Sequence, residues 1–288
     1  MQIYTSYQKA FQNCMLTQTY TIAHLHHLSK NINVDTSGCY KVFFLLSGSK
    51  KFHINNYVYD ITSNELFLIG PEEWHYFSHF NENDNHERFV IFIYPEYLKA
   101  SSSLKTNLLD CFSYKIQASL HNTVLSEEEK KHFLYYIYIH SVSESYGDDL
   151  LDHAYFLEFM VFLNTITLSH RNDACAAVNT LRFHNKTVTE ILSYLDMHII
   201  EDLSIDALAR HFFLSPSYLC KIFKKATGIT IHKYINAQRI TLAKKYLTEG
   251  YSVIEVVEMC GFNDYNAFLK AFLKEVGVSP KKYSQFLM

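Results

Sequence analysis

Four small or basic side chains would share one face of a helix over residues 215–226. They stand at positions i, i+3, i+4 and i+7, and they are Ser217, Cys220, Lys221 and Lys224. The opposite face of this helix carries an apolar stripe of Leu219, Ile222 and Phe223. A lysine donates hydrogen bonds to guanine edges or to phosphate oxygens. This division of faces therefore suits a helix that packs on its own domain and lies in the major groove of DNA.

A second segment, residues 263–275, shows the same division of faces. Its inward stripe is Phe268, Ala271 and Phe272, and its outward side chains are Tyr265, Asn266, Leu269 and Lys270. An asparagine pairs with adenine through two hydrogen bonds. Lysines at helical spacing also occur on the solvated face of an ordinary helical bundle. The repetition of a whole structural unit, described next, favours nucleic-acid binding over that alternative.

Both segments belong to a repeated unit of helix, tight turn and helix. Residues 204–209 correspond to residues 252–257 with an offset of 48, and beyond the turn the offset is 49. The later matches pair Leu219, Lys221, Phe223 and Gly228 with Phe268, Lys270, Phe272 and Gly277. Gly261 permits a sharp turn between the helices of the second copy. The repeat predicts two helix-turn-helix units, at about 204–226 and 252–275.

Residues that cap helices stand where each expected helix begins. Ser204 and Ser252 each precede an apolar run, and Ser252 with Glu255 forms a capping box. Ser215–Pro216 combines an N-cap with a proline at the first helical position. Asn263 is the expected cap of the last repeated helix. The helix boundaries are therefore marked locally.

The segment between the two units predicts a spacer helix with basic side chains. Residues 230–247 would form about five turns, roughly 27 Å long, which would hold two recognition helices about one DNA turn (~34 Å) apart. Residues 215–288 carry 11 Lys+Arg and 5 Asp+Glu, a net charge of +6, although the whole chain has −3. The candidates for contacts with phosphate or the groove edge are Lys224, Lys225, Lys244, Lys245, Tyr265 and Lys274.

Short apolar runs between residues 40 and 94 predict β-structure. The runs are 40–46, 51–54, 57–61, 65–69 and 88–94, separated by Gly, Ser, Asn and Pro. Strands at a spacing of about ten residues are typical of a β-barrel or a sandwich.

Two long apolar helices are expected after this β-region, at about 127–144 and 149–169. Ser126 and Glu129 form a capping box for the first helix. The second helix carries the candidate dimer contacts Leu150, Leu157, Met160 and Leu163. The alternative is that these side chains close the open end of a barrel within one chain.

The C-terminal motifs resemble those of the AraC/XylS family of bacterial transcription regulators. The resemblance covers about 187–286, and its most specific stretches are 214–224, 261–272 and 277–283. It implies that bases are read by Ser217, Cys220, Lys221, Asn266 and Lys270. The sequence departs from the family pattern at Leu273 and Ser284, where the family often has a basic residue. This departure weakens the phosphate contacts expected of the second unit.

The N-terminal half resembles the cupin-like sensor domain common in that family, through residues 45–48 and 64–75. Cupin enzymes bind a metal through clustered His and Glu. The usual His-x-His before the first strand is missing from 34–41, and His75 stands alone. We therefore expect no metal site, no cofactor and no catalytic residues. A small barrel can enclose one small molecule, so an effector of unassigned identity is expected to bind there.

Apolar runs and cysteine spacing indicate the cellular compartment in which the protein is expected. The sequence contains no run of 18 uncharged apolar residues and no signal-peptide pattern at its start, so neither a membrane span nor secretion is expected. The six cysteines form no CxxC pair, which favours free thiols in a reducing cytoplasm.

These observations together predict a cytoplasmic, homodimeric regulator that binds double-stranded DNA and responds to a small molecule. The sequence leaves open whether transcription is raised or lowered; an activator would have RNA polymerase as a further partner. The expected organisation is a cupin-like sensor domain (1–120), a helical dimerisation segment (121–170), a linker (171–186) and the DNA-binding domain (187–288). Two alternatives stay open: a cupin-type metalloenzyme with an accessory DNA-binding tail, and a constitutive DNA-binding protein whose front half only dimerises.

Overall fold

The computed structural model describes most of the chain. The described residues are 2–26, 38–48, 50–55, 57–71, 73–78, 86–113, 121–139, 145–170, 186–276 and 278–285. The expected linker at 171–186 lies outside these residues except for its last one.

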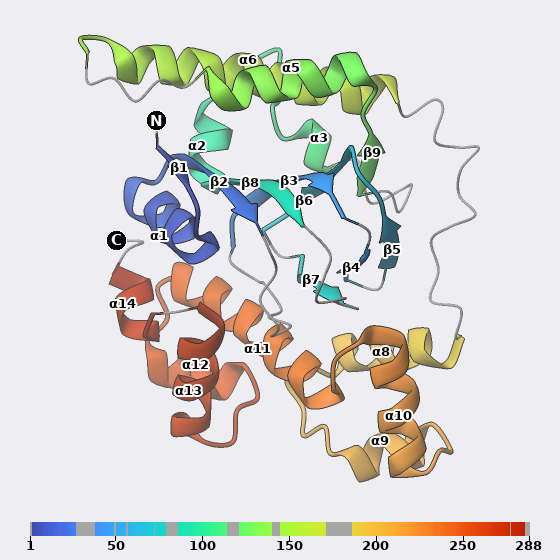
Figure 1. Ribbon diagram of the computed structural model, residues 1–288. Coiled ribbons are helices and arrows are strands. Elements are labelled where there is room, and N and C mark those ends of the chain that lie inside the picture. The colour runs from blue at the N-terminus through green and yellow to red at the C-terminus, as the bar shows by residue number, and fades with distance from the viewer. Residues whose placement is uncertain are drawn as a thin grey trace.

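A six-stranded sheet forms the centre of the N-terminal region (Figure 1). Its strands are β1 (Ile3–Tyr4), β2 (Tyr20–His26), β3 (Tyr40–Ser47), β6 (Glu65–Ile69), β8 (Glu87–Ile93) and β9 (Asn122–Val124). The strand order is β1-β2-β8-β3-β6-β9, with β1 and β2 parallel and the other neighbours antiparallel. The central strands β3 and β8 are almost entirely buried, which explains their near-continuous apolar runs.

A smaller sheet faces one side of the large one. It consists of β4 (Lys50–Ile54), β5 (Tyr57–Ile61) and β7 (His75–Ser78), in the order β5-β4-β7. Aromatic rings fill the space between the sheets: the ring of Phe52 lies 5.0 Å from Phe67 and 5.4 Å from Phe43. Of the two β-architectures that the strand spacing allowed, the described strands form two packed sheets and not a closed barrel, because no described pairing joins one sheet to the other.

Three short helices complete the sheet region. Helix α1 (Tyr7–Thr17) is capped by Ser6 and packs on the same face of the large sheet as the small sheet does. Helix α2 (Pro95–Ala100) and helix α3 (Asp110–Ser113) follow β8. Helix α1 was not among the expected elements, although its buried side chains Ala10, Phe11, Cys14 and Met15 follow the spacing of one helix face.

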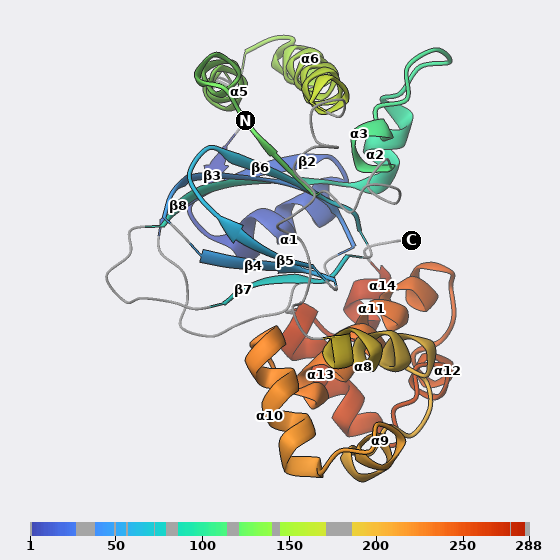
Figure 2. The ribbon, with the colours of Figure 1, turned by 90° about the vertical axis from the view of Figure 1, so that its right-hand side faces the viewer.

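Helices α5 (Glu127–Tyr138) and α6 (Asp148–Ser169) cover the other face of the large sheet (Figure 2). The capping box of Ser126 and Glu129 begins α5 as expected. Helix α5 ends at Tyr138, earlier than the expected 144, and residues 140–144 lie outside the described ones. Met160 and Leu163 are fully buried in this core, so their assignment to a dimer contact was wrong.

The C-terminal region is helical throughout. Its helices are α8 (Lys186–Met197), α9 (Ile205–His211), α10 (Pro216–Thr227), α11 (Ile231–Thr248), α12 (Val253–Met259), α13 (Tyr265–Val276) and α14 (Pro280–Gln285). Helix α11 runs between two groups, α8–α10 and α12–α14 (Figure 1). The whole helical region lies on the side of the sheets opposite α5 and α6 (Figure 2).

Five cysteines lie in the described residues, and all five are free thiols. Cys14, Cys39, Cys111 and Cys260 are buried, and Cys220 is exposed.

None of the helices in the described part of the chain combines the length and the apolar composition needed to cross a membrane.

Candidate nucleic-acid interface

Helix α10 presents the polar face that the sequence predicts. Ser215 caps it by accepting a hydrogen bond from the Tyr218 backbone N–H, and Gly228 ends it with φ of 78°. Leu219 and Phe223 are fully buried, so the rotation of the helix about its axis is fixed. Its exposed side chains include Ser217, Cys220, Lys221, Lys224 and Lys225. These groups are free to meet bases or phosphates in a groove.

Helix α13 has the same buried stripe but a different cap. Asp264, not the expected Asn263, accepts the hydrogen bond from the Ala267 backbone N–H at 2.7 Å. A carboxylate at this position also interacts favourably with the helix dipole, which explains why it replaces the neighbouring amide. The exposed side chains are Tyr265, Asn266, Lys270, Leu273 and Lys274, with Leu273 53% exposed. Gly277, which the repeat pairs with Gly228, lies outside the described residues.

The turn between the helices differs in the two units. Gly261 turns the second unit with φ of 73°, and a Cβ at this position would collide with the carbonyl oxygen of Ile200. The equivalent residue of the first unit, 48 positions earlier, is Phe213, with φ of 54° and a side chain that is 95% exposed. A bulky residue in the left-handed region is uncommon and carries backbone strain.

Helix α11 fixes the arrangement of the two units. Arg239 donates hydrogen bonds to the carbonyl oxygens of Ile199 and Glu201, at 2.9 and 2.6 Å, and its guanidinium lies 5.7 Å from the centre of the Phe262 ring. One side chain thus joins the loop that precedes the first unit to the turn of the second. Partial burial lowers the pKa of Arg239, with no consequence for its charge at neutral pH.

The two lysines near the end of α11 have different surroundings. Lys245 is exposed, as a phosphate contact requires. Lys244 is only 4% exposed, so its ammonium group does not face the surface and its assignment as a phosphate contact was wrong. Adjacent helix positions lie about 100° apart around the axis, so one of two neighbouring lysines on a packed helix turns inward.

The sheet region packs directly on the first unit through Trp74 and Tyr76. Both side chains are buried in the core of α8–α11, and the Trp74 ring meets Tyr234 of α11 edge-on at 5.0 Å. The Tyr234 hydroxyl donates a 2.5 Å hydrogen bond to Asp196. No contact between these two side chains and the helices was expected from the sequence, in which the single tryptophan just before a strand was the available sign.

A search against family models matches residues 208–285 to a helix-turn-helix domain. Among curated proteins, the chain is 33% identical over 103 residues to the regulatory protein PocR of Salmonella typhimurium, covering 35% of this chain and 34% of PocR. It is 28% identical over 127 residues to the transcriptional activator RhaS of Salmonella newport, covering 44% and 45% of the two chains. The C-terminal region therefore contains a helix-turn-helix domain that is similar in sequence to domains of these two regulators.

Solved structures match either the helix-turn-helix region or most of the chain. The DNA-binding domain of AdpA, solved with a target DNA, is 27% identical and covers 35% of this chain and 92% of its own, with a TM-score of 0.34. ToxT from Vibrio cholerae is 15% identical and covers 94% and 99%, with a TM-score of 0.38. The chain spans less than half the length of the curated relatives PocR and RhaS.

Proposed function

We propose that this chain is a sequence-specific regulator of transcription that reads double-stranded DNA with α10 and α13. The observation that carries this proposal is the pair of capped helices, each with one face buried and one polar face exposed, joined by α11. The proposed base-reading side chains are Ser217, Cys220, Lys221, Asn266 and Lys270. The matches of this domain to relatives named as regulators support the assignment.

Selection of bound DNA fragments from a genomic library by the full chain tests this function. We expect a recovered motif with two contacted patches about one helical turn (~34 Å) apart on one duplex face. A variant carrying Lys221→Ala and Asn266→Ala should lose the motif but keep non-specific binding, because phosphate contacts carry no sequence information. Recovery of random fragments by the wild type would contradict sequence-specific reading.

We further propose that two copies of the chain form a dimer through the outer face of α6. This helix belongs to the proposed dimerisation segment 121–170, which lies between the proposed sensor domain 1–120 and the proposed DNA-binding domain 187–288. Large apolar side chains remain exposed there: Leu150 (71%), Leu151 (52%), Val161 (49%) and Leu168 (41%). Leu157, which the sequence suggested for this role, is half-buried against the core beneath α5 and α6, so only part of its side chain is available for a dimer contact. A symmetric dimer would use this patch twice.

Sedimentation of a Val161→Glu variant tests the dimer. Because Val161 is half exposed, the variant should fold and sediment as a monomer. The matched control is Leu104→Glu, which introduces the same charge at a fully exposed apolar side chain outside α6. A Val161→Glu protein that sediments like the wild type would exclude this face.

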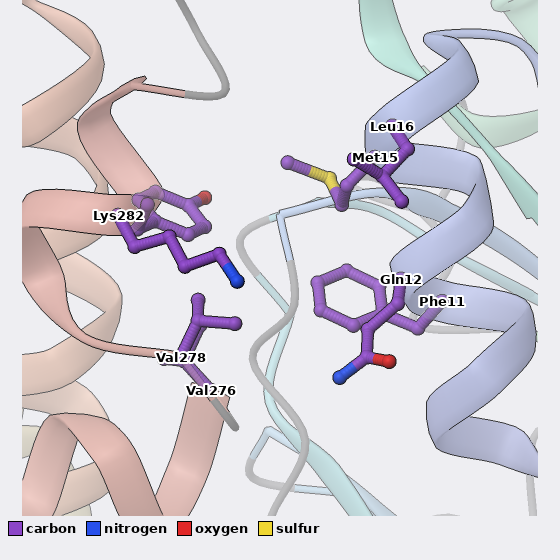
Figure 3. A pocket seen from close by; sticks show the side chains of 8 residues that line it. Phe11, Gln12, Met15, Leu16, Val276, Val278 and Lys282 are labelled. Atoms are coloured by element: carbon purple, nitrogen blue, oxygen red, sulfur yellow. The ribbon is translucent and has the colours of Figure 1, made fainter.

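We also propose that a small effector binds in the cavity between α1 and α14. This cavity of about 210 Å³ is lined by Phe11, Gln12, Met15, Leu16, Val276, Val278, Lys282 and Tyr283 (Figure 3). The lining is mostly apolar and includes one amide and one ammonium group, which suits a small, largely apolar molecule with a hydrogen-bonding end. A ligand here would touch both the sheet region and the helices of the second unit. RNA polymerase is the further partner proposed for an activator.

A thermal-shift screen of small metabolites tests the effector site. A molecule that binds the folded chain raises its melting temperature by mass action. Met15→Trp should fill the cavity and abolish the shift for any hit, whereas Leu104→Trp, at a fully exposed side chain, should leave it unchanged. A hit that stabilises the Met15 variant equally binds elsewhere.

A further inference from the structure

Two histidines of β2 and one glutamate of β8 lie together at one end of the six-stranded sheet. His24 and His26 are two residues apart on a strand, so both rings project from the same face. Glu87 is the register partner of His26 on β8. The atoms of the three side chains that can bind a metal all lie within 4.8 Å of one another.

This cluster lies on the helix-covered face of the sheet, not between the two sheets. The His24 ring stacks on Phe89 at 4.2 Å, and Phe89 meets Tyr138 at the end of α5 at 5.8 Å. Phe89 belongs to the core beneath α5 and α6. The side chains of His24 and Glu87 are 20% and 37% exposed, so an ion can reach them from solvent.

We propose that His24, His26 and Glu87 bind a divalent transition-metal ion such as Zn²⁺. Two imidazole nitrogens and one carboxylate oxygen form an established ligand set for this ion, with bonds of about 2.0–2.2 Å and a fourth position left open. Ligand atoms at tetrahedral positions around such an ion stand about 3.3 Å apart. His24 Nε2 and Glu87 Oε1 are within hydrogen-bond distance, 2.7 Å apart. Placing an ion between them requires the two atoms to separate by only about half an ångström.

The third ligand distinguishes this cluster from an ordinary His–Glu pair. His198 and Glu201 form such a pair at 2.8 Å on an exposed helical turn, and His170 and Glu129 form another at the same distance. Within the described part of the chain, His24, His26 and Glu87 are the one group of three possible ligands that lie close enough together. His26 makes no hydrogen bond to another described residue, so its ring is available to an ion.

An ion at this position would join the end of β2 to the end of β8 at the border with α5. Binding to the folded chain alone would raise the melting temperature by mass action, as for any ligand.

Calorimetric titration of the whole chain with Zn²⁺, after treatment with a chelator, tests the site. The titration contains no DNA, so its outcome does not depend on the proposed regulatory function. We expect one Zn²⁺ per chain, with affinity reduced at least tenfold in Glu87→Gln and in His26→Ala. Glu87→Gln keeps the size of the side chain, and His26 is exposed, so both variants should fold. His198→Ala is the matched control, because it removes one member of a His–Glu pair that has no third ligand.

A second readout separates loss of the site from loss of the fold. The wild type and His198→Ala should gain melting temperature with Zn²⁺, whereas Glu87→Gln and His26→Ala should melt normally without the ion and gain nothing with it. Equal Zn²⁺ affinity in the wild type and Glu87→Gln, or an equal loss in His198→Ala, overturns the proposal. Absence of stoichiometric binding by the wild type overturns it as well.

Discussion

In the first helix-turn-helix unit, residues 204–226, four basic side chains accompany one acidic side chain, whereas in the second unit, residues 252–275, two basic side chains accompany four acidic ones. The net charges are therefore +3 and −2. The two units share caps, buried stripes and the helix-turn-helix arrangement. The same fold thus offers a strongly attractive surface to phosphates in one unit and a weakly repulsive one in the other. We expect the first unit to supply most of the affinity and the second to add selectivity through Asn266.

The largest expected effect is on the salt dependence of binding. If the domain makes about six phosphate contacts, its affinity for a full site should fall about 10³-fold between 50 and 200 mM salt. Fluorescence anisotropy on DNA that keeps only one half-site resolves the two units. The half-site of the first unit should retain most of the slope. Equal slopes for the two half-sites would break the electrostatic part of the comparison.

Gly261→Ala should have the next largest effect. The left-handed conformation alone costs an alanine about 1–2 kcal/mol, and the new Cβ would also collide with the carbonyl oxygen of Ile200. We expect the free energy of unfolding to fall by about 2 kcal/mol or more in urea denaturation. The control is Gly250→Ala, which also has a positive φ, of 91°, but has open space around it. A loss in Gly261→Ala no larger than in this control would show that Ile200 yields without cost.

Lys221→Ala tests the difference between the units at the level of a single side chain. If Lys221 reads a base, its loss should weaken binding of the full site by about 1–3 kcal/mol, measured by competition with mismatched sites. Lys270→Ala should cost less, because it removes a cation from a unit that contributes little attraction. Lys245→Ala, a phosphate contact by our assignment, should weaken all DNA sequences alike. A larger loss for Lys270→Ala would reverse the ranking of the units.

The smallest expected effect comes from the turn of the first unit. Phe213→Gly relieves a positive φ and removes almost no buried surface. Because glycine also adds freedom to the unfolded chain, we expect a net gain of about 0.5–1 kcal/mol in the free energy of unfolding. Thermal denaturation measures this gain in the free energy of unfolding. Phe213→Ala is the control, because alanine keeps the backbone strain of a positive φ. A destabilised Phe213→Gly protein would mean that the exposed ring is held by a contact.

Local features of the helical region were predictable from the sequence. The capping box of Ser252 and Glu255, the cap at Thr230 and the stop at Gly228 depend on residues at most a few positions away. The one misplaced cap, Asn263 for Asp264, is a shift by a single residue between two good capping types. The Lys244 side chain could not be placed in the same way, because its burial depends on helices that pack on α11 from elsewhere in the chain.

The sheet region was less predictable because its contacts are remote in sequence. His121 bonds Tyr59 at 2.5 Å and Glu73 at 2.7 Å, across separations of 62 and 48 residues. Strand β2 pairs with β8, more than sixty residues later, so the meeting of His24, His26 and Glu87 depends on that topology. The alternation His-Leu-His in an apolar run was the local sign of a shared face, and it did not reveal the third partner. The burial of Met160 and Leu163 likewise follows from the position of α5.

The edge-on contact between Trp74 and Tyr234 gives the protein an intrinsic fluorescent probe at the contact between the sheet region and the first helix-turn-helix unit. The protein contains a single tryptophan, and that ring is 2% exposed where the sheet region meets the first helix-turn-helix unit. All indole fluorescence therefore comes from the joint between the two regions. If effector or DNA separates them, the indole enters water and its emission moves to longer wavelength, and if they stay docked the emission stays unchanged. Movement at this joint can thus be followed in unlabelled protein.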